Sequence, residues 1–290
     1  MSEDHSPPSA VVVGVDGSKA AIRAALWAVD EAASRDIPLR LVYAIEPGET
    51  SETDPEDAAR KLATAEISVR YALTAVEAAG KPVKIEVEIV QGSPTGALIH
   101  ASRSAAMIVV GSVGLRHFAD GRVGSTAASL AASAHCPVAI IRGRDDTGSS
   151  HAGWIVVEVD QSAENAAVMQ RGVEEALLRR APLRMLTAWQ SKFTDIHDGH
   201  AVADGNRQAR AQLNRRLARW TRQYPDLDIE SVAVHGTVLN YLAGNVKSVQ
   251  LVVVSARDTG DVGELVGPTG NAVLHDTDCS LLIVDRQSCL

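Results

Sequence analysis

The stretch GSVGLRHFADGRVGST, residues 111–126, combines residue types that can hold phosphate groups. Glycines let backbone N–H groups approach a ligand closely, and the start of a helix offers unpaired N–H donors with partial positive charge. Each N–H bond to a charged oxygen contributes about 1.5–3 kcal/mol, so three or four of them would hold a triphosphate without a basic patch. The residues concerned are Gly111, Gly114, Gly121, Gly124, Ser125 and Thr126. The same pattern fits a turn-rich connection that ends in a helix cap, and spacing alone leaves this alternative open.

Short apolar runs and longer helical patterns alternate on either side of this stretch, which predicts an α/β fold with a doubly wound, five-stranded parallel sheet. Ligands of such sheets bind beyond the carboxyl ends of the strands, where the strand order reverses. Asp16 follows the first strand and Gly111 closes the fourth, so the two residues face one crevice if these strands are neighbours. The expected strands are 10–15, 39–45, 83–90, 106–111 and 137–142, and the expected helices are 19–34, 56–79, 95–103 and 124–134.

The chain repeats itself at a shift of 144 residues. This shift aligns VVVGVDGS (11–18) with IVVEVDQS (155–162), and RDIPLRLVYAI (35–45) with RRAPLRMLTAW (179–189). Such self-similarity indicates a tandem duplication.

The duplication divides the 290 residues into two expected domains, 1–148 and 149–290. The polar segment RDDTGSSHAG (144–153) between the copies has the composition of a linker. Each domain is long enough to bury a core of its own.

Charge and composition exclude several classes of protein. The net charge of −8 and the pI near 5.6 argue against a general binder of nucleic acids or anionic membranes, which require a basic face. The acidic, polar N-terminus lacks the apolar core of a signal peptide, and no apolar run is long enough to span a bilayer, so a cytoplasmic protein is expected. Cys136, Cys279 and Cys289 include no CxxC pair and are expected to be free thiols.

Several motifs in order make the sequence similar to the universal stress protein family. Gly111, Gly114, Gly124 and Ser125 fit the family's G-x2-G-x9-G-S/T motif for ATP. VVVGVDGS at the start, VQGSPTGALI before the third helix and CPVAIIRG at the end lie in matching positions. The resemblance covers both copies and implies two tandem Rossmann-like sheets of the adenine nucleotide alpha hydrolase-like type.

The resemblance also implies the residues that bind the nucleotide. Asp16 lies beside the adenosine, and a backbone group of Ala44 contacts the adenine. The phosphates, with Mg²⁺, are held by Gly111, Gly114, Gly124, Ser125 and Thr126. The residues themselves leave another role open for Asp16, since Asp-Gly-Ser is common turn and cap chemistry.

The second copy departs from this motif. Its counterpart SARDTGDVGELVGPTG (255–270) has Ser255 for Gly111, Asp258 for Gly114 and Pro268 for Ser125, in a loop that is one residue shorter. Pro268 removes both a hydroxyl and an N–H donor, and a carboxylate at Asp258 repels phosphate. We therefore expect the second copy to bind ATP weakly or not at all.

The resemblance implies an ATP-binding regulator of the stress response with slow or no hydrolysis. An ATP-hydrolysing or adenylyl-transferring enzyme and a nucleotide-free scaffold are the alternatives. The sequence has neither a GxxxxGK[ST] P-loop nor a GxSxG nucleophile elbow. The family also implies pairing of the two domains through their fifth strands and a homodimer. The charge and composition predict no nucleic acid or membrane partner.

Overall fold

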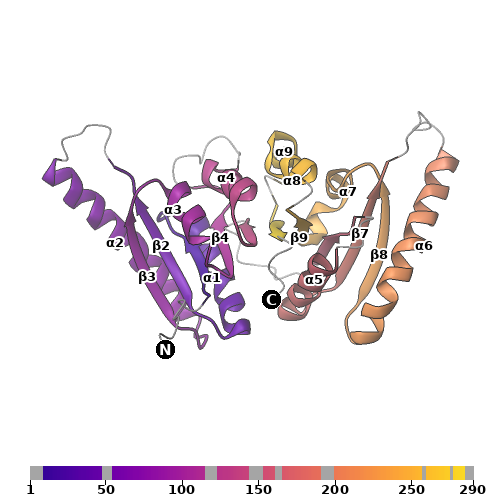
Figure 1. Cartoon of the computed structure of the whole chain (residues 1–290), viewed down its shortest axis with the longest axis horizontal. Coiled ribbons are helices and arrows are strands. Elements are labelled where there is room, and N and C mark those ends of the chain that lie inside the picture. The colour runs from indigo at the N-terminus through magenta and orange to yellow at the C-terminus, as the bar shows by residue number, and fades with distance from the viewer. Residues whose placement is uncertain are drawn as a thin grey trace, which may run out of the picture. The chain divides into compact units, whose positions relative to one another are not determined.

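The strands in the first half of the chain are the apolar runs expected from the sequence. In the computed structural model, the residues described are 9–47, 54–114, 123–143, 153–160, 165–190, 199–256, 259–274 and 277–284. The chain forms two units, Met1–Gly143 and Arg144–Leu290, and the described residues of each contribute five parallel strands (Figure 1). The strands of the first unit are β1 (Val11–Gly14), β2 (Leu39–Ile45), β3 (Ile85–Gln91), β4 (Met107–Gly111) and β5 (Val138–Ile141).

The strand order of the first unit is β3-β2-β1-β4-β5, so β1 has β2 on one side and β4 on the other. The expected adjacency of the first and fourth strands is therefore confirmed, and it places the switch point at β1. Residues of β1, β4 and β5 are almost completely buried, as continuous apolar strands predict.

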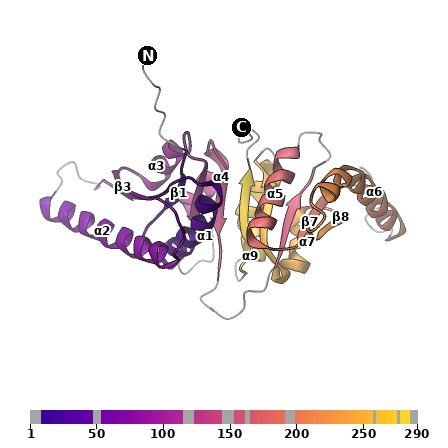
Figure 2. The ribbon, with the colours of Figure 1, turned by 90° about the horizontal axis from the view of Figure 1, so that it is seen from below.

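Two pairs of helices cover the sheet of the first unit. The helices are α1 (Lys19–Arg35), α2 (Pro55–Ala78), α3 (Pro94–Ala101) and α4 (Ser125–Ser133). Helix α1 packs beside α2, and α3 packs beside α4. Figure 2 shows the two pairs on opposite faces of the sheet. Right-handed crossovers on either side of β1 produce this arrangement, because the connections run in opposite directions from the switch point.

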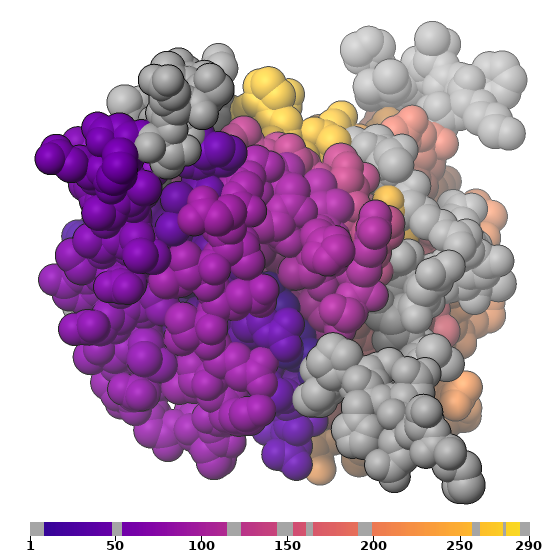
Figure 3. Space-filling view, turned by 60° about the vertical axis from the view of Figure 1, so that its left-hand side comes forward, coloured from indigo at the N-terminus to yellow at the C-terminus, as the bar shows by residue number. Residues whose placement is uncertain are grey.

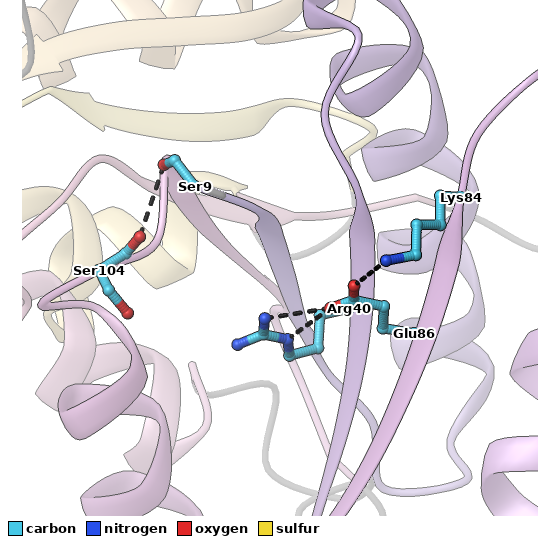
Figure 4. Close-up of polar contacts among 5 residues, drawn as sticks. All are labelled: Ser9, Arg40, Lys84, Glu86 and Ser104. Atoms are coloured by element: carbon cyan, nitrogen blue, oxygen red, sulfur yellow. Dashed lines mark hydrogen bonds and ion pairs between the residues drawn. The ribbon is translucent and has the colours of Figure 1, made fainter. Parts of the chain in front are cut away.

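The edge of the first unit at β3 is partly exposed and carries polar contacts, which Figure 4 shows. Figure 3 shows residues of the first unit, in indigo to magenta, at the surface on this side. Glu86 on β3 accepts hydrogen bonds from Lys84, at 2.9 Å, and from Arg40 of β2, at 3.0 and 3.1 Å. The bond from Lys84, together with that from Arg40, lowers the pKa of Glu86 below its usual value, and burial opposes the shift. The three side chains thus link the two outer strands through ion pairs.

The second unit repeats this topology with the order β8-β7-β6-β9-β10. Its strands are β6 (Trp154–Glu158), β7 (Leu183–Trp189), β8 (Ile229–His235), β9 (Val249–Ser255) and β10 (Ser280–Val284). Its helices are α5 (Ala166–Arg179), α6 (Gly199–Gln223), α7 (Val238–Asn245), α8 (Thr259–Val266) and α9 (Pro268–Leu274), with a 3₁₀ turn η3 (Val246–Ser248) before β9. The expectation of tandem five-stranded parallel sheets is confirmed.

The duplication preserved backbone conformations as well as apolar runs. Asp36 and Arg180, which end α1 and α5, both adopt the left-handed conformation, with φ of 53° and 50°. Gly92 and Gly236 both have positive φ, at 136° and 104°, just after the third strand of each unit. Among the described residues, none of the helices is both long and apolar enough to cross a bilayer.

Candidate functional site

A cavity of about 510 Å³ opens at the carboxyl ends of β1, β2 and β4 in the first unit. Every site residue expected from the sequence lines it: Asp16, Ala44, Gly111, Gly114, Gly124, Ser125 and Thr126. These residues come from three segments, the turn after β1, the end of β2 and the connection from β4 to α4. The doubly wound sheet brings them together because parallel strands end at the same edge. Residues 115–122, which include Gly121, lie outside the described part of the chain.

The N-terminus of α4 faces this cavity without a side-chain cap. The other three helices of the unit are capped: Ser18 accepts from Ala21 N, Asp54 from Glu56 N and Ser93 from Gly96 N. At α4 the N-cap is Gly124, which has no side chain to accept a hydrogen bond.

The backbone N–H groups of the first turn of α4 therefore remain available to an anion. Residues 125–127 all line the cavity, and their N–H groups lie before the first intrahelical hydrogen bond, which Ala128 N donates to the carbonyl oxygen of Gly124 at 3.0 Å. The N–H of Gly124 is not one of these donors, because it donates to the carbonyl oxygen of Ser112 at 2.8 Å. Gly124 therefore positions the helix, whereas residues 125–127 present N–H donors and partial positive charge to the cavity.

Asp16 fulfils the turn role that the sequence left open and also lines the cavity. Its Oδ1 accepts from Ser18 N at 2.9 Å, and Gly17 between them has φ of 86°. A Cβ at Gly114 would lie 2.6 Å from Oδ2 of Asp16, so a side chain at 114 would displace this carboxylate. A carboxylate introduced at Gly114 would therefore disturb the cavity by displacing Asp16 as well as by its own negative charge.

Gly111 has a packing role that the motif did not reveal. A Cβ there would lie 2.8–2.9 Å from the carbonyl carbon, Cβ and carbonyl oxygen of Ala20 in the first turn of α1. Glycine at the end of β4 therefore allows α1 to approach the sheet at the switch point. This part of the pattern serves the fold as well as any ligand.

One side of the cavity, formed by α2, is cationic and was not expected from the sequence. Arg60, Lys61 and Thr64 line it, and Asp57 in the preceding turn pairs with both cations. The Lys61 Nζ lies 2.8 Å from Oδ2 of Asp57. The hydrogen bond from Lys61, together with that from Arg60, lowers the pKa of Asp57 below its usual value.

The helical periodicity of α2 could have predicted that Lys61 lies beside the cavity. The buried residues of α2 include Ala65, Ser68 and Ala72, and Lys61 continues this stripe one turn toward the N-terminus. Lys61 therefore lies on the buried side of α2, close to the start of the helix, and faces the carboxyl edge of the sheet as well as solvent. Its side chain is 35% exposed, whereas that of Arg60 is 79% exposed.

The corresponding region of the second unit contains a tryptophan that packs against the helix. Trp189, at the end of β7, donates from Nε1 to Asn206 Oδ1 at 2.7 Å and makes an edge-to-face contact with His235 at 4.7 Å. Gly205 of α6, the counterpart of Lys61 at the shift of 144, packs against the ring, since a Cβ there would lie 2.1 Å from Cη2. Aromatic and helix atoms thus meet where the first unit has Lys61 beside its cavity.

In the second unit, the segment that corresponds to the glycine loop is largely helical. Residues 259–266 form helix α8, followed directly by α9 with Pro268 as its first residue. This segment, one residue shorter than its counterpart in the first unit, therefore contains a helix that packs on α9. Ser255 is buried at the end of β9, and Asp258 lies outside the described residues.

A magnesium ion would find few protein ligands here, in keeping with its usual chemistry. The carboxylates lining the cavity are those of Asp16 and Glu46, and the described part of the chain contains no group of three or more potential metal-ligating side chains. Mg²⁺ typically retains water ligands and binds one or two carboxylates together with substrate phosphates. The donor set therefore fits an ion that arrives with phosphate, and it does not form a complete protein cage.

Comparison with known proteins agrees with the tandem architecture. The sequence model of the Universal stress protein family matches residues 9–142 and again residues 154–285. The Universal stress protein Rv2028c of Mycobacterium tuberculosis is 53% identical over 287 residues, which cover 99% of each chain. The Universal stress protein Rv2624c of the same organism is 43% identical over 276 residues, covering 95% of this chain and 96% of that one.

Solved structures show the same fold at low sequence identity. The crystal structure of a universal stress protein from Archaeoglobus fulgidus has a TM-score of 0.67, covers 96% of both chains and is 15% identical. At this identity the similarity concerns the fold alone.

Proposed function

The chain belongs to the universal stress protein family, and from this premise we propose that its first unit binds an adenine nucleotide with its phosphates at the N-terminus of α4. The uncapped first turn of α4, facing a cavity that all seven expected residues line, carries this proposal. The cavity volume of about 510 Å³ lies within the usual range for small-molecule sites. We assign the adenine contact to Ala44 at the carboxyl end of β2 and the contact beside the adenosine to Asp16, both of which line the cavity.

The nucleotide proposed is ATP with Mg²⁺ on its phosphates. Several N–H donors at α4 favour a ligand with a chain of charged oxygens, since each such bond contributes about 1.5–3 kcal/mol. When bound, Mg²⁺ neutralises part of the phosphate charge, and the protein supplies the amide donors and the adenine contact. We propose that occupancy regulates binding of a partner and that hydrolysis is slow or does not occur.

We further propose one nucleotide per chain. Trp189 and Gly205 occupy the region of the second unit that corresponds to the cationic side of the cavity, and Pro268 replaces the N–H of Ser125. A ligand would have to displace the tryptophan ring and would meet fewer donors.

The identity and stoichiometry of bound nucleotide test these proposals. The full chain, freed of any co-purified ligand, is titrated with ATP and Mg²⁺ by calorimetry, and the expected stoichiometry is one. Two equal sites per chain would contradict the role of the second unit, and the absence of any adenine nucleotide binding would contradict the site. Rapid release of phosphate in a single turnover would favour the enzyme over the regulator.

A further inference from the structure

Helix α6 of the second unit concentrates positive charge in an acidic chain. Its 25 residues, Gly199–Gln223, include six arginines and a single acidic residue, Asp204, whereas the whole chain has a net charge of −8. The helix packs on β8, and its buried residues are Leu213 and Leu217 (Figure 1). Like charges three or four residues apart destabilise a helix, so the arginines require an explanation other than the stability of α6.

Three of the six arginines make polar contacts within the second unit. Arg207 forms an ion pair with the aspartate one turn before it. Arg210 donates from Nε to Ser231 Oγ on β8 at 3.3 Å. Arg216 donates from Nη1 to the carbonyl oxygen of Asp160 at 2.5 Å. These three side chains therefore hold α6 against the rest of the unit.

The other three arginines, Arg215, Arg219 and Arg222, form what we call the arginine stripe. Their positions i, i+4 and i+7 place them on one face of the helix, about 6 Å and then about 4.5 Å apart along its axis. This face lies opposite the buried Leu213 and Leu217. All three arginines are exposed, and among the residues that the structure describes none of them has a hydrogen-bonding or ion-pair partner. The stripe therefore presents three planar guanidinium groups, each able to bind a carboxylate through two N–H groups.

The corresponding helix of the first unit, α2, has no such stripe. At the shift of 144, the three positions fall on Tyr71, Ala75 and Ala78. Helix α2 contains four acidic and three basic residues, so its charges nearly balance. The two units share one topology, and the shared fold therefore does not require the charge of α6. This difference indicates a surface function that belongs to the second unit.

Acidic residues on both sides limit the length of the arginine stripe. Asp204 precedes it on α6, and Asp226 and Asp228 follow Arg222 by four and six residues; all three aspartates are exposed. A nucleic acid carries phosphate along its whole length, and an anionic membrane presents negative charge over a wide plane. Either of them would extend beyond the stripe and meet these carboxylates.

The apolar residues of α6 also argue against a membrane. Within the described part of the chain, the large exposed apolar side chains belong to other elements, and none of them lies on α6. A helix that lies in a membrane surface needs such side chains to enter the boundary between head groups and acyl chains. The features of α6 therefore favour a partner whose negative charge is confined to about two helical turns.

We propose that the arginine stripe is a docking surface for a helix of a partner protein that presents carboxylates at positions i, i+4 and i+7. A helix of this kind, lying along α6, matches the axial spacing of the three arginines, and each guanidinium can pair with one carboxylate. Recognition of acidic segments by arginine clusters is a recurrent mode of protein binding. The inference does not depend on the nucleotide site, because α6 belongs to the second unit.

Fluorescence anisotropy with the full-length protein and two labelled synthetic peptides tests the inference. Both peptides are helices of about 20 residues, built from alanine and glutamine with three glutamates. One has the glutamates at i, i+4 and i+7, on one face, and the other has them at i, i+5 and i+10, on different sides of the helix. The first peptide should bind about tenfold more tightly, because it forms three surface ion pairs with the stripe while the second forms one.

The combined variant Arg215→Gln, Arg219→Gln and Arg222→Gln removes the stripe and should bind both peptides equally weakly. Glutamine is a good helix former, and the substitutions also remove repulsion between like charges. The melting temperature of this variant should therefore equal or exceed that of the unaltered protein, which separates lost binding from lost folding.

The matched control combines Arg70→Gln, Arg103→Gln and Lys247→Gln. These three residues are exposed cations outside α6, so the control removes the same amount of positive charge from other parts of the surface. It should keep the tenfold preference for the first peptide. A control that loses this preference as the stripe variant does would attribute binding to net charge and would overturn the proposal.

Other outcomes would also overturn the proposal. One is equal affinity of the unaltered protein for the two peptides, and another is a preference that persists in the stripe variant. Stripe-dependent binding that is tighter to a single-stranded RNA of about 12 nucleotides, or to phosphatidylglycerol vesicles, would assign the stripe to a nucleic acid or a membrane instead. A lower mass of the stripe variant in sedimentation would show that the surface joins copies of this chain.

Discussion

Gly124→Asp distinguishes an anion-binding helix N-terminus from an ordinary turn. Gly124 is the N-cap of α4, with φ of −59° and ψ of 147°, an extended conformation that any residue can adopt. A Cβ there would be no closer than 3.7 Å to a heavy atom, the carbonyl oxygen of Ser112. Aspartate therefore fits the backbone and the space, and its carboxylate can accept from N–H groups of the first turn.

The expected effects on stability and on binding differ in size. Aspartate and glycine differ by only a few tenths of a kcal/mol as N-caps, and a negative charge at a helix N-terminus adds about 0.3–1 kcal/mol of stabilisation. The free energy of unfolding should therefore stay the same or rise slightly. In binding, the carboxylate takes one donor, worth about 1.5–3 kcal/mol to a phosphate, and repels the ligand as well. A total loss of about 3 kcal/mol or more corresponds to an affinity lower by over 100-fold.

Calorimetry with ATP, together with thermal unfolding in the absence of nucleotide, measures both effects. Gly124→Ala is the control, because it adds the same Cβ without an acceptor or a charge, and its affinity should fall only a few-fold. The reasoning is refuted if Gly124→Asp binds ATP as the unaltered protein does. It is also refuted if Gly124→Ala loses as much affinity as Gly124→Asp, because close backbone approach rather than the free donors would then explain the glycine.

Three further predictions concern the fold around the site. Gly111→Ala should lower the free energy of unfolding by about 1–3 kcal/mol, because its Cβ would overlap the backbone of Ala20; denaturant unfolding measures this, and an unchanged midpoint would contradict the packing role. Gly205→Ala should displace the ring of Trp189 and change the tryptophan fluorescence while leaving ATP affinity in the first unit unchanged; an unaltered emission spectrum would show that the ring does not pack there. Because the folded-state pKa of Glu86 is lowered, its ionised form stabilises the protein above the unfolded-state pKa, and this contribution is lost as the pH falls through the folded-state pKa. We expect Glu86→Gln to lose less stability relative to the unaltered protein below about pH 4.5, the ordinary pKa of a glutamate carboxyl. Unfolding at pH 7 and in steps down to pH 3 measures this difference in stability. A difference that stays constant with pH would contradict the role of the ion pairs.

The sequence by itself determined the elements, the duplication and the composition of the crevice. Continuous apolar runs such as 107–111 are typical of strands covered on both faces, and a parallel sheet with short crossovers then has few possible strand orders. Asp16, Ala44 and Gly111 followed from this topology, because residues just beyond parallel strands meet at one edge. Gly92 and Gly236 are glycines in both copies because the backbone has positive φ there, a conformation that glycine adopts readily.

Only the tertiary structure decided which atoms from distant segments approach one another. The close packing of Gly111 on Ala20 depends on the distance between a helix and a strand, and no local pattern encodes that distance. The ring of Trp189 meets Gly205 because α6 packs along the end of β7, and Lys61 faces the cavity because burial of the α2 stripe fixes the rotation of that helix. Local sequence sets each element and its apolar face, whereas the packing of those faces against one another sets which polar groups meet at the carboxyl edge.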